Sequence, residues 1–512
     1  MTFNSLNFIF IFLPITVAGY YLLRKTRFAN CFMLVMSMIF YAASAPWYLI
    51  PMLFSALVDY IVGQKIQDSE NPVYRKRMLI ISIVINLGLL SVFKYTGWLS
   101  SEVATLFGVF GVSVKAITLP LPAGISFYTF QSMSYAIDIY RKEFKPHRNV
   151  IDYLSFVSFF PHLVAGPIMR ARDLLPQLAS IRKFPSYQDL SKAFFMILFG
   201  LFQKCVVADN IGAIVNTITK IAESQNHKLQ PGLGLIFMYG FALQIYCDFA
   251  AYSTIARGVA KLFNVNLIKN FMTPYFAVSP SDFWSRWHIS LSTWLRDYLY
   301  IPLGGNRNGT WNTNRNLLIT MFLGGIWHGA GLFFALWGVY HGLLLILYRN
   351  FPIDAQLIKI FGKKAGKFFA IFLMFHLVCF GWILFRASPQ QFIPICSSII
   401  SVPSAIINHI HNYNEYFQGL NIFSIGFLKI CHGVFTGWFT ANWYLTVYGW
   451  GLILFSASII IFDYFAWKKN LEFPDLYSFI PLPAKVFVLI FLIYGLQFFG
   501  RREANEFIYF AF

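Results

Sequence analysis

The chain has 512 residues, of which 57% are hydrophobic and only 12% are charged. Water-soluble proteins carry about 25% charged residues, so this composition excludes soluble enzymes, secreted domains and disordered chains. The 40 lysine and arginine residues exceed the 21 aspartate and glutamate residues and give a net charge of +19, which in a membrane protein indicates basic cytoplasmic loops and not a nucleic-acid surface.

A series of apolar segments approaches the ~20 residues that a helix needs to span a bilayer. They predict an all-α polytopic membrane protein with about 10–12 transmembrane helices, to which we add re-entrant and interfacial helices. We expect one membrane-embedded domain over residues 1–512. The apolar segments are residues 6–23, 28–43, 46–63, 78–98, 119–140, 193–207, 233–255, 317–348, 368–385, 448–465 and 484–500.

The loops between the first segments are basic. Lysine and arginine occur in residues 24–27, in residues 75–77 and in residues 141–148. The positive-inside rule places these loops in the cytoplasm and the N-terminus outside. Residues 6–23 have no basic residues before them and no small-residue cleavage site after them, so we expect a first transmembrane helix and not a removable signal.

Two of the apolar stretches contain residues that break helices. Residues 155–168 include Pro161, Gly166 and Pro167, which predicts a re-entrant or buried segment. Residues 317–348 are too long for one straight span, and glycines on both sides of His328 predict a break there. Broken backbone at membrane depth is tolerated only where protein or a water-filled cavity satisfies its polar groups, so both segments indicate a cavity.

Residues 279–307 form the densest cluster of polar and aromatic side chains in the chain. At helical spacing they predict an amphipathic helix at the cytoplasmic interface, with tryptophans at the depth of the lipid headgroups. A simple membrane anchor would have the same pattern. The aromatic stripe contains Trp284, Trp287, Leu291, Trp294 and Tyr298, and the ionisable residues are Asp282, Arg286, His288, Arg296 and Asp297.

His328 is the strongest catalytic candidate, because an imidazole in a glycine-lined break can exchange a proton near neutral pH. A buried histidine bonded to a neighbouring helix carbonyl is the structural alternative. His409 and His411 have no third ligand nearby, and we expect no metal site. Nucleotide-binding, serine-hydrolase and zinc-protease motifs are missing from the sequence. Proton transfer by histidine therefore fits acyl transfer from an already activated thioester, with no further cofactor.

Seven motifs stand out along the chain, in residues 119–141, 159–168, 200–210, 244–258, 279–307, 323–331 and 506–512. Together they resemble the membrane-bound O-acyltransferase family, and within it the bacterial branch that contains alginate O-acetyltransferases. The resemblance covers nearly the whole chain, with its core motifs in residues 119–349. Cys247 and the pair Ala250 and Ala251 depart from the usual form of the fourth motif, so the resemblance implies the reaction and not the exact substrate.

The resemblance implies that His328 is the catalytic histidine and that His288 occupies the second family position. It implies helices around a thinned central cavity, where a cytoplasmic tunnel for the acyl donor meets a funnel from the other side. The expected protein lies in the bacterial inner membrane as a multi-pass protein. It transfers acetyl from cytoplasmic acetyl-CoA, through a periplasmic hydrolase-like (SGNH) acetyltransferase partner, to an alginate-like exopolysaccharide or to peptidoglycan of the cell envelope.

Arginines and a terminal tyrosine complete the predicted site. We expect Arg286, Arg296 and Arg307 to border a cytoplasmic entry for coenzyme A, because guanidinium groups bind phosphate in a bidentate manner. The positive-inside rule alone would also explain them. Tyr509, in the tail 503–512, is predicted to be a transient acyl carrier facing outside, as the resemblance supports; an interfacial anchor is the alternative, and Arg501 and Arg502 favour a cytoplasmic tail.

Three other functions fit parts of the sequence. D-alanyl transfer to a cell-envelope polymer is the nearest enzymatic alternative, and it would require a docking surface for a carrier protein. A transporter or flippase of an acylated carrier would also use broken helices, although the sequence shows no clear internal repeat. A structural scaffold in an export complex would make His328 dispensable.

Overall fold

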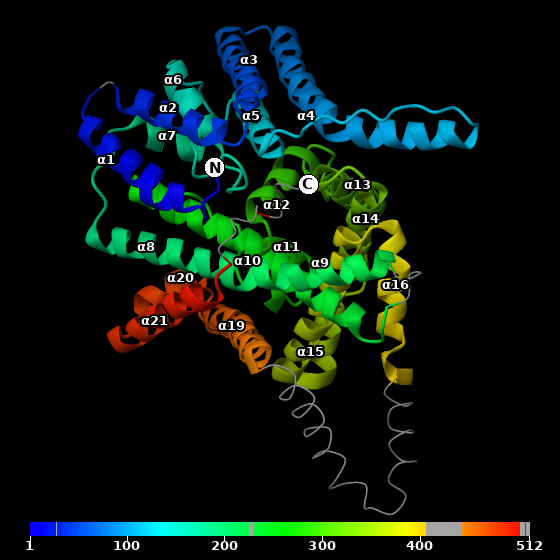
Figure 1. Cartoon of the computed structure of the whole chain (residues 1–512). Coiled ribbons are helices and arrows are strands. Elements are labelled where there is room, and N and C mark those ends of the chain that lie inside the picture. Colours follow the sequence, from blue (N-terminus) through cyan, green and yellow to red (C-terminus); the bar gives the residue numbers. More distant parts are fainter. Residues whose placement is uncertain (27, 225–228, 406–442, 502–506, 508–512) are drawn as a thin grey trace, which may run out of the picture.

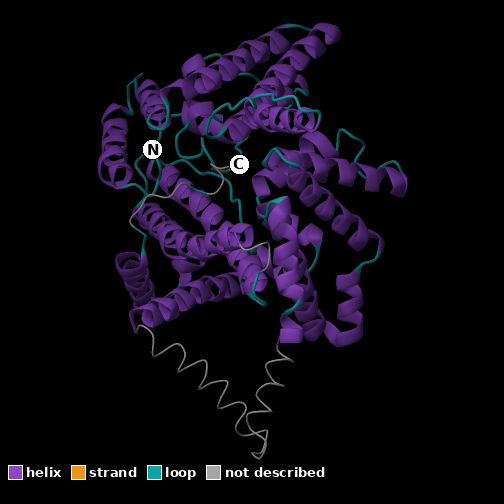
Figure 2. Ribbon diagram, turned by 45° about the vertical axis from the view of Figure 1, so that its right-hand side comes forward, coloured by secondary structure: helices purple, strands orange, loops and turns teal. Residues whose placement is uncertain are grey.

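The computed structural model describes residues 1–26, 28–224, 229–405, 443–501 and 507. Within these residues the fold consists of helices and loops and contains no strand (Figure 2). The helices are α1 (Leu13–Leu23), α2 (Ala29–Ala42), α3 (Leu49–Asp68), α4 (Pro72–Val109), α5 (Ile125–Tyr140), α6 (Val150–Ser158), α7 (Ala171–Ala179), α8 (Tyr187–Leu201), α9 (Asp209–Ser224), α10 (Leu233–Leu262), α11 (Pro280–Arg286), α12 (Ile289–Leu295), α13 (Gly309–His328), α14 (Leu332–Asn350), α15 (Ile353–Arg386), α16 (Pro389–Ile400), α19 (Trp443–Lys468), α20 (Phe473–Leu476) and α21 (Leu482–Phe499).

The helices confirm the predicted polytopic membrane protein. Among the described residues, 8 helical segments are long and apolar enough to cross a bilayer, and two shorter apolar helical segments, Phe8–Leu23 and Ala29–Ala42, precede them. The candidate spans are Pro46–Asp68, Pro72–Val109, Tyr187–Glu223, Leu233–Leu262, Leu332–Asn350, Ile353–Arg386, Gly449–Lys468 and Leu482–Phe499.

Local sequence explains where several helices begin. Proline occupies the first turn of α4, α11 and α16, where its missing N–H costs no intrahelical hydrogen bond. The Asn71 side chain accepts hydrogen bonds from the first turn of α4, and Ser279 does the same at α11. Ser388 and Gln391 form a reciprocal capping box at α16.

Long helices cross one another around the centre of the molecule (Figure 1). α8 and α10 pack at close distance because glycines replace side chains at their contact: a Cβ at Gly200 would lie 2.9 Å from the carbonyl oxygen of Ala251. α13 and α14 form a second tightly packed pair, and α14 also contacts α15. α3, α4 and α5 pack together on another side of the molecule.

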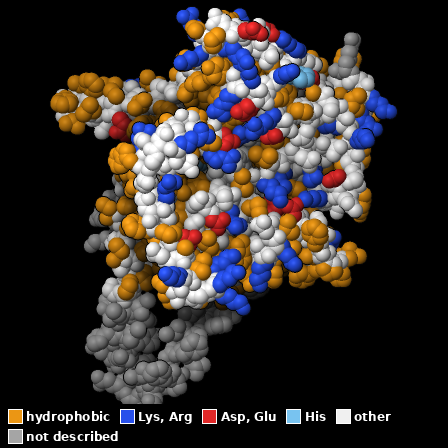
Figure 3. Space-filling view, turned by 180° about the vertical axis from the view of Figure 1, so that it is seen from behind, with side chains coloured by type: hydrophobic (Ala, Val, Ile, Leu, Met, Phe, Trp, Pro, Cys, Tyr) orange, Lys and Arg blue, Asp and Glu red, His pale blue; other side chains and the backbone are white. Residues whose placement is uncertain are grey.

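The second half of α4 projects from the body as an arm (Figure 1). Hydrophobic side chains cover most of this arm in the view from behind (Figure 3). Leu99, Val103, Leu106 and Phe107 are exposed there. Exposed apolar side chains on this scale are expected where a protein surface faces lipid.

Two of the predicted apolar segments are buried inside the protein, unlike a helix that faces lipid. α5 is 16 residues long and nearly all of its side chains are buried in protein, so it is an internal helix of the membrane domain. Residues 155–168 are broken as predicted: α6 ends at Ser158, and the buried chain that follows includes Phe159, Leu163 and Ile168. Pro161 prevents α6 from continuing, and neighbouring helices bury the irregular backbone that contains Gly166 and Pro167.

Candidate active site

The long apolar stretch 317–348 breaks at the predicted place. α13 ends at His328, Gly329 is extended with φ −160°, and α14 begins at Leu332. The two helices touch backbone to backbone, because a Cβ at Gly325 would lie 2.3 Å from the carbonyl oxygen of Phe334. This glycine contact holds His328 at the tip of a rigid helical hairpin.

Aromatic side chains surround His328. The residue is 3% exposed, and its ring centroid lies 5.0 Å from that of Trp327, 5.1 Å from that of Trp337 and 5.4 Å from that of Phe385. His341, one helix further on, is also buried and lies 4.9 Å from Trp337 between ring centroids. Aromatic rings thus shield both imidazoles from solvent and restrict their orientation.

His288 lies beside His328. The two imidazole centroids are 6.3 Å apart, and His288 is completely buried against Phe249 and Phe127. His288 has φ 42°, a left-handed conformation that is uncommon for residues other than glycine and often marks functional positions.

Asn270 holds the backbone next to His288. Its carbonyl oxygen accepts a hydrogen bond from the Ile289 N–H at 3.0 Å, and its side-chain oxygen accepts one from the Ser290 N–H at 3.2 Å. Ser290 Oγ in turn accepts a hydrogen bond from the Ile168 N–H at 3.0 Å. Buried hydrogen bonds therefore join the broken segment 155–168 to the His288 turn.

The structure corrects the prediction for residues 279–307. They do not form one amphipathic helix: α11 ends at Arg286, α12 begins at Ile289, and a π-helical turn (Arg296–Tyr300) follows. Trp287 and Trp294 are buried inside the protein and do not face lipid headgroups. The apolar side chains Trp287 and Leu291 pack inside the protein, and the left-handed backbone at His288 separates the two short helices.

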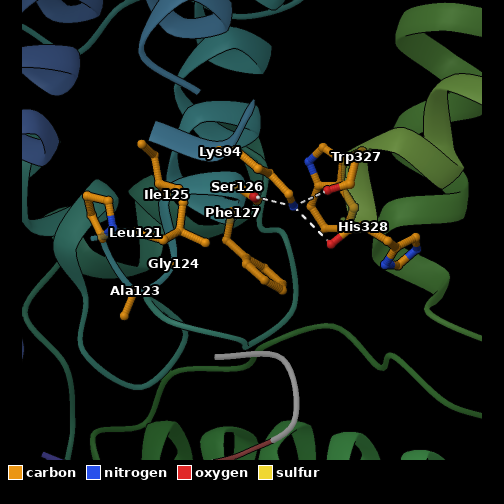
Figure 4. Close-up of a pocket in the computed structure, with 10 residues that line it drawn as sticks. Lys94, Leu121, Ala123, Gly124, Ile125, Ser126, Phe127, Trp327 and His328 are labelled. Atoms are coloured by element: carbon orange, nitrogen blue, oxygen red, sulfur yellow. Dashed lines mark hydrogen bonds between the residues drawn. The ribbon is translucent and has the colours of Figure 1, made fainter. Parts of the chain in front are cut away.

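A small pocket reaches the end of α13 next to His328 (Figure 4). Residues 121–127, Trp327, His328 and Lys94 of α4 line it. Gly124 is required in this wall: it has φ 76°, and a Cβ there would lie 2.6 Å from the carbonyl oxygen of Leu163. Sequence analysis did not identify Lys94, because it is a single lysine within an apolar segment, although an ionisable residue at such a position is itself a functional signal.

The three predicted coenzyme A arginines differ in their surroundings. Arg286 is paired with Asp282 at 2.7 Å and donates to the carbonyl oxygen of Met272 at 3.3 Å. Arg296 has a 59% exposed side chain and is paired with Asp297 at 2.7 Å, whereas Arg307 is exposed in the loop before α13. Arg286 is therefore engaged within the protein, and Arg296 and Arg307 are accessible.

Further arginines gather around Arg296, and sequence reasoning missed them. Arg170 pairs with Asp297 at 2.7 Å, and Arg141 donates to the carbonyl oxygen of Asp297 at 3.2 Å. Both guanidinium groups lie over the Tyr298 ring. Burial alone would raise the pKa of Asp297, but hydrogen bonds from Arg296 and Arg170 hold that pKa below its ordinary value.

Other predicted positions fall elsewhere. Tyr509, together with His409 and His411, lies outside the described residues. Within the described part of the chain, no group of three or more His, Cys, Asp or Glu side chains has the arrangement of a metal site.

Comparison with known proteins agrees with this architecture. The sequence model of the membrane-bound O-acyltransferase family matches residues 140–380. The chain is 37% identical over 391 residues to a probable alginate O-acetylase AlgI of Pseudomonas putida, covering 76% of this chain and 77% of that relative. It is 33% identical over 417 residues to a peptidoglycan O-acetyltransferase of Helicobacter pylori, covering 76% and 77%.

A more distant relative is a teichoic acid D-alanyltransferase of Bacillus subtilis, 30% identical over 278 residues, or 52% of this chain and 69% of that protein. The alignments agree with the candidate membrane-spanning helices and with the buried histidine pair. The chain belongs to the membrane-bound O-acyltransferase family and is a multi-pass membrane acyltransferase.

Proposed function

We propose that this protein transfers acetyl groups from cytoplasmic acetyl-CoA across the bacterial inner membrane for O-acetylation of an alginate-like exopolysaccharide or of peptidoglycan. The observation that carries the proposal is the buried pair His288 and His328, 6.3 Å apart between ring centroids, beside a pocket that reaches the end of α13. The names of the relatives, an alginate O-acetylase and a peptidoglycan O-acetyltransferase, support an acetyl group and an envelope polymer.

The proposed reaction needs one base and good orientation. His328 takes the proton from an acceptor hydroxyl, and the oxygen attacks the thioester carbonyl carbon of acetyl-CoA. The carbon–sulfur bond breaks, and the coenzyme A thiolate leaves and recovers the proton from the His328 imidazolium. His288, held by Asn270, positions the thioester or the acceptor against His328.

The decisive experiment replaces the proposed base. His328→Ala should lower acetyl transfer from radiolabelled acetyl-CoA by ~10²–10⁴-fold, the range for loss of a positioned general base. The variant should keep the thermal unfolding midpoint and the gel-filtration profile of the wild type in detergent. Wild-type transfer by a folded His328→Ala protein would disprove the assignment.

The arginines around Tyr298 are the proposed donor-binding region. We include Arg286, Arg296 and Arg307 as predicted, and we favour Arg296 as the phosphate-binding residue because its side chain is accessible and shares Asp297 with Arg170. Arg296→Gln should raise the KM for acetyl-CoA more than it lowers kcat. An unchanged KM in all three single variants would show that these arginines do not bind the donor and only follow the positive-inside rule.

Tyr509 is the proposed acyl carrier on the outer side. Its phenol would receive the acetyl group near His328 and pass it to a periplasmic hydrolase-like partner. Tyr509→Phe keeps the ring and removes only the nucleophile, so transfer to an outside acceptor should vanish. A wild-type rate in that variant, or a C-terminal tag found in the cytoplasm, would overturn the carrier role and favour an anchor.

D-alanyl transfer is the second candidate, because a teichoic acid D-alanyltransferase is among the relatives. The acetyl donor is preferred, since the relatives named for O-acetylation align over a larger share of this chain. Supplying the purified protein with either labelled acetyl-CoA or a D-alanylated carrier protein separates the two. Labelling from the carrier protein alone would replace acetyl with D-alanyl.

A further inference from the structure

Two adjacent residues of α4 bind the end of the helix that carries His328. Tyr95 donates its hydroxyl hydrogen to the carbonyl oxygen of Ile326 at 2.9 Å. The Lys94 ammonium group donates to the carbonyl oxygen of His328 at 3.0 Å and to that of Trp327. Three consecutive carbonyls at the C-terminus of α13 are therefore satisfied by side chains from a helix more than 200 positions earlier in the chain.

These carbonyls need an external partner. The last four carbonyls of an α-helix have no intrahelical donor, and many helices satisfy some of them with a left-handed residue that folds back on the last turn. Gly329 is extended instead, with φ −160° and ψ 153°, and leads the chain away toward α14. Lys94 and Tyr95 thus replace the usual backbone cap.

A lysine suits this place for electrostatic reasons. The C-terminus of a helix carries partial negative charge, which a cation stabilises. Lys94 is 8% exposed. A third hydrogen bond, to Ser126 Oγ at 3.4 Å, gives each of its three N–H donors an acceptor. Burying an ammonium group is costly unless hydrogen bonds compensate it, so the position is maintained only if these three acceptors stay in place.

The bound carbonyls belong to the backbone of the proposed base. Figure 4 shows the ammonium group between Ser126 and the carbonyls of Trp327 and His328, while the His328 imidazole extends away from it. Lys94 thus contacts the main chain of His328 and not its ring. Fixing that main chain fixes the Cα–Cβ direction, which limits the positions that the imidazole can take relative to His288 through its side-chain rotamers.

We propose that Lys94 and Tyr95 are positioning residues that lock the C-terminus of α13 and so aim His328 at the reacting groups. This inference rests on the proposed role of His328 as the base. Neither residue takes part in bond making, and neither binds the donor. The expected signature is therefore a loss of kcat with an unchanged donor KM.

The test compares four variants in detergent with radiolabelled acetyl-CoA. Lys94→Met removes the cap with a similar side-chain length and should lower kcat by ~10²-fold, the typical cost of misplacing a catalytic group by about 1 Å. Lys94→Arg keeps the charge and several N–H donors and should recover most of kcat. Tyr95→Phe removes one of the three bonds and should lower kcat by less. Lys76→Met, at an exposed position of the same helix, is the control and should equal the wild type.

Each result has a defined meaning. Wild-type kcat in a folded Lys94→Met protein, or a donor KM that rises as much as kcat falls, would overturn the positioning role. If Lys94→Met fails to fold, Tyr95→Phe decides, because wild-type kcat in that variant would also overturn it. His328→Ala in the same assay separates the two proposals: if it is inactive while Lys94→Met is fully active, the cap alone is wrong, and if His328→Ala is active, the proposed base itself is wrong.

Discussion

At the scale of single residues, the left-handed backbone of His288 restricts which residue types this position tolerates. A φ of 42° is strained for most residues with a Cβ, and asparagine tolerates it better than most. We predict that His288→Asn keeps the thermal unfolding midpoint of the wild type and retains part of acetyl transfer. His288→Leu should lower the midpoint and reduce transfer by ~10²-fold, because a branched apolar side chain supplies no polar group to the site.

Both variants are measured by thermal unfolding in detergent and by transfer from labelled acetyl-CoA. The comparison separates conformation from chemistry, since asparagine fits the backbone and remains polar. Equal transfer rates in His288→Asn and His288→Leu would show that the polar side chain is not needed and that only the turn matters.

At the scale of elements, the contact between α13 and α14 depends on missing side chains. Besides its close approach to Phe334, a Cβ at Gly325 would lie 3.0 Å from the Cα of Gly338, so both sides of the contact are backbone and cannot move aside cheaply. We predict that Gly325→Ala destabilises the protein by ~1–3 kcal/mol, the usual cost of overpacking, and lowers acetyl transfer by displacing His328. Thermal unfolding and the transfer assay measure the two effects.

Gly88 provides the matched control on α4. A Cβ added there would meet no atom within 4 Å, and Gly88 is exposed. Because alanine is the better helix former, Gly88→Ala should be neutral or stabilising by up to ~1 kcal/mol. If Gly325→Ala unfolds at the same temperature as Gly88→Ala, the hairpin is not close-packed and does not hold His328.

At the scale of the whole molecule, ion pairs of Asp475 connect the C-terminal helices to α8 and to the chain after α10. This residue of α20 is paired with Lys192 of α8 and with Lys269, which follows α10. Burial alone would raise the pKa of Asp475, but hydrogen bonds from the two ammonium groups outweigh it and lower the pKa from 3.8 to about 2. A lowered pKa in the folded state means that the carboxylate stabilises the fold.

The sign of this linkage predicts a pH dependence. The contribution of Asp475 is complete above the unfolded value of 3.8 and is lost as the pH falls toward about 2. Asp475→Asn should therefore unfold at a lower temperature than the wild type at about pH 5, and the difference should shrink in acid. Unfolding midpoints in an acid-stable detergent across this range test it, and a difference that does not change with pH would show that the charge is not responsible.

Much of the architecture follows from local composition. Runs of apolar residues predict helices in a bilayer, because each exposed charge or unpaired peptide group there is costly. This cost depends on the composition of the segment itself and not on its partners. For the same reason the break at His328 and the irregular chain after Ser158 were predictable, since glycine and proline act on their own backbone. Family resemblance then singled out His288 and His328 as a pair.

Contacts between side chains of different helices depend on the tertiary structure. The sequence predicted an all-α membrane protein and the position of the helix break, because these depend on hydropathy and on backbone breakers, and its resemblance to the family supplied His288 and His328 as candidates. It did not predict that Trp287 is enclosed by protein, that Arg170 lies beside Asp297, or that Lys94 caps α13. Those contacts join residues far apart in the chain, and their partners are set by how the helices pack.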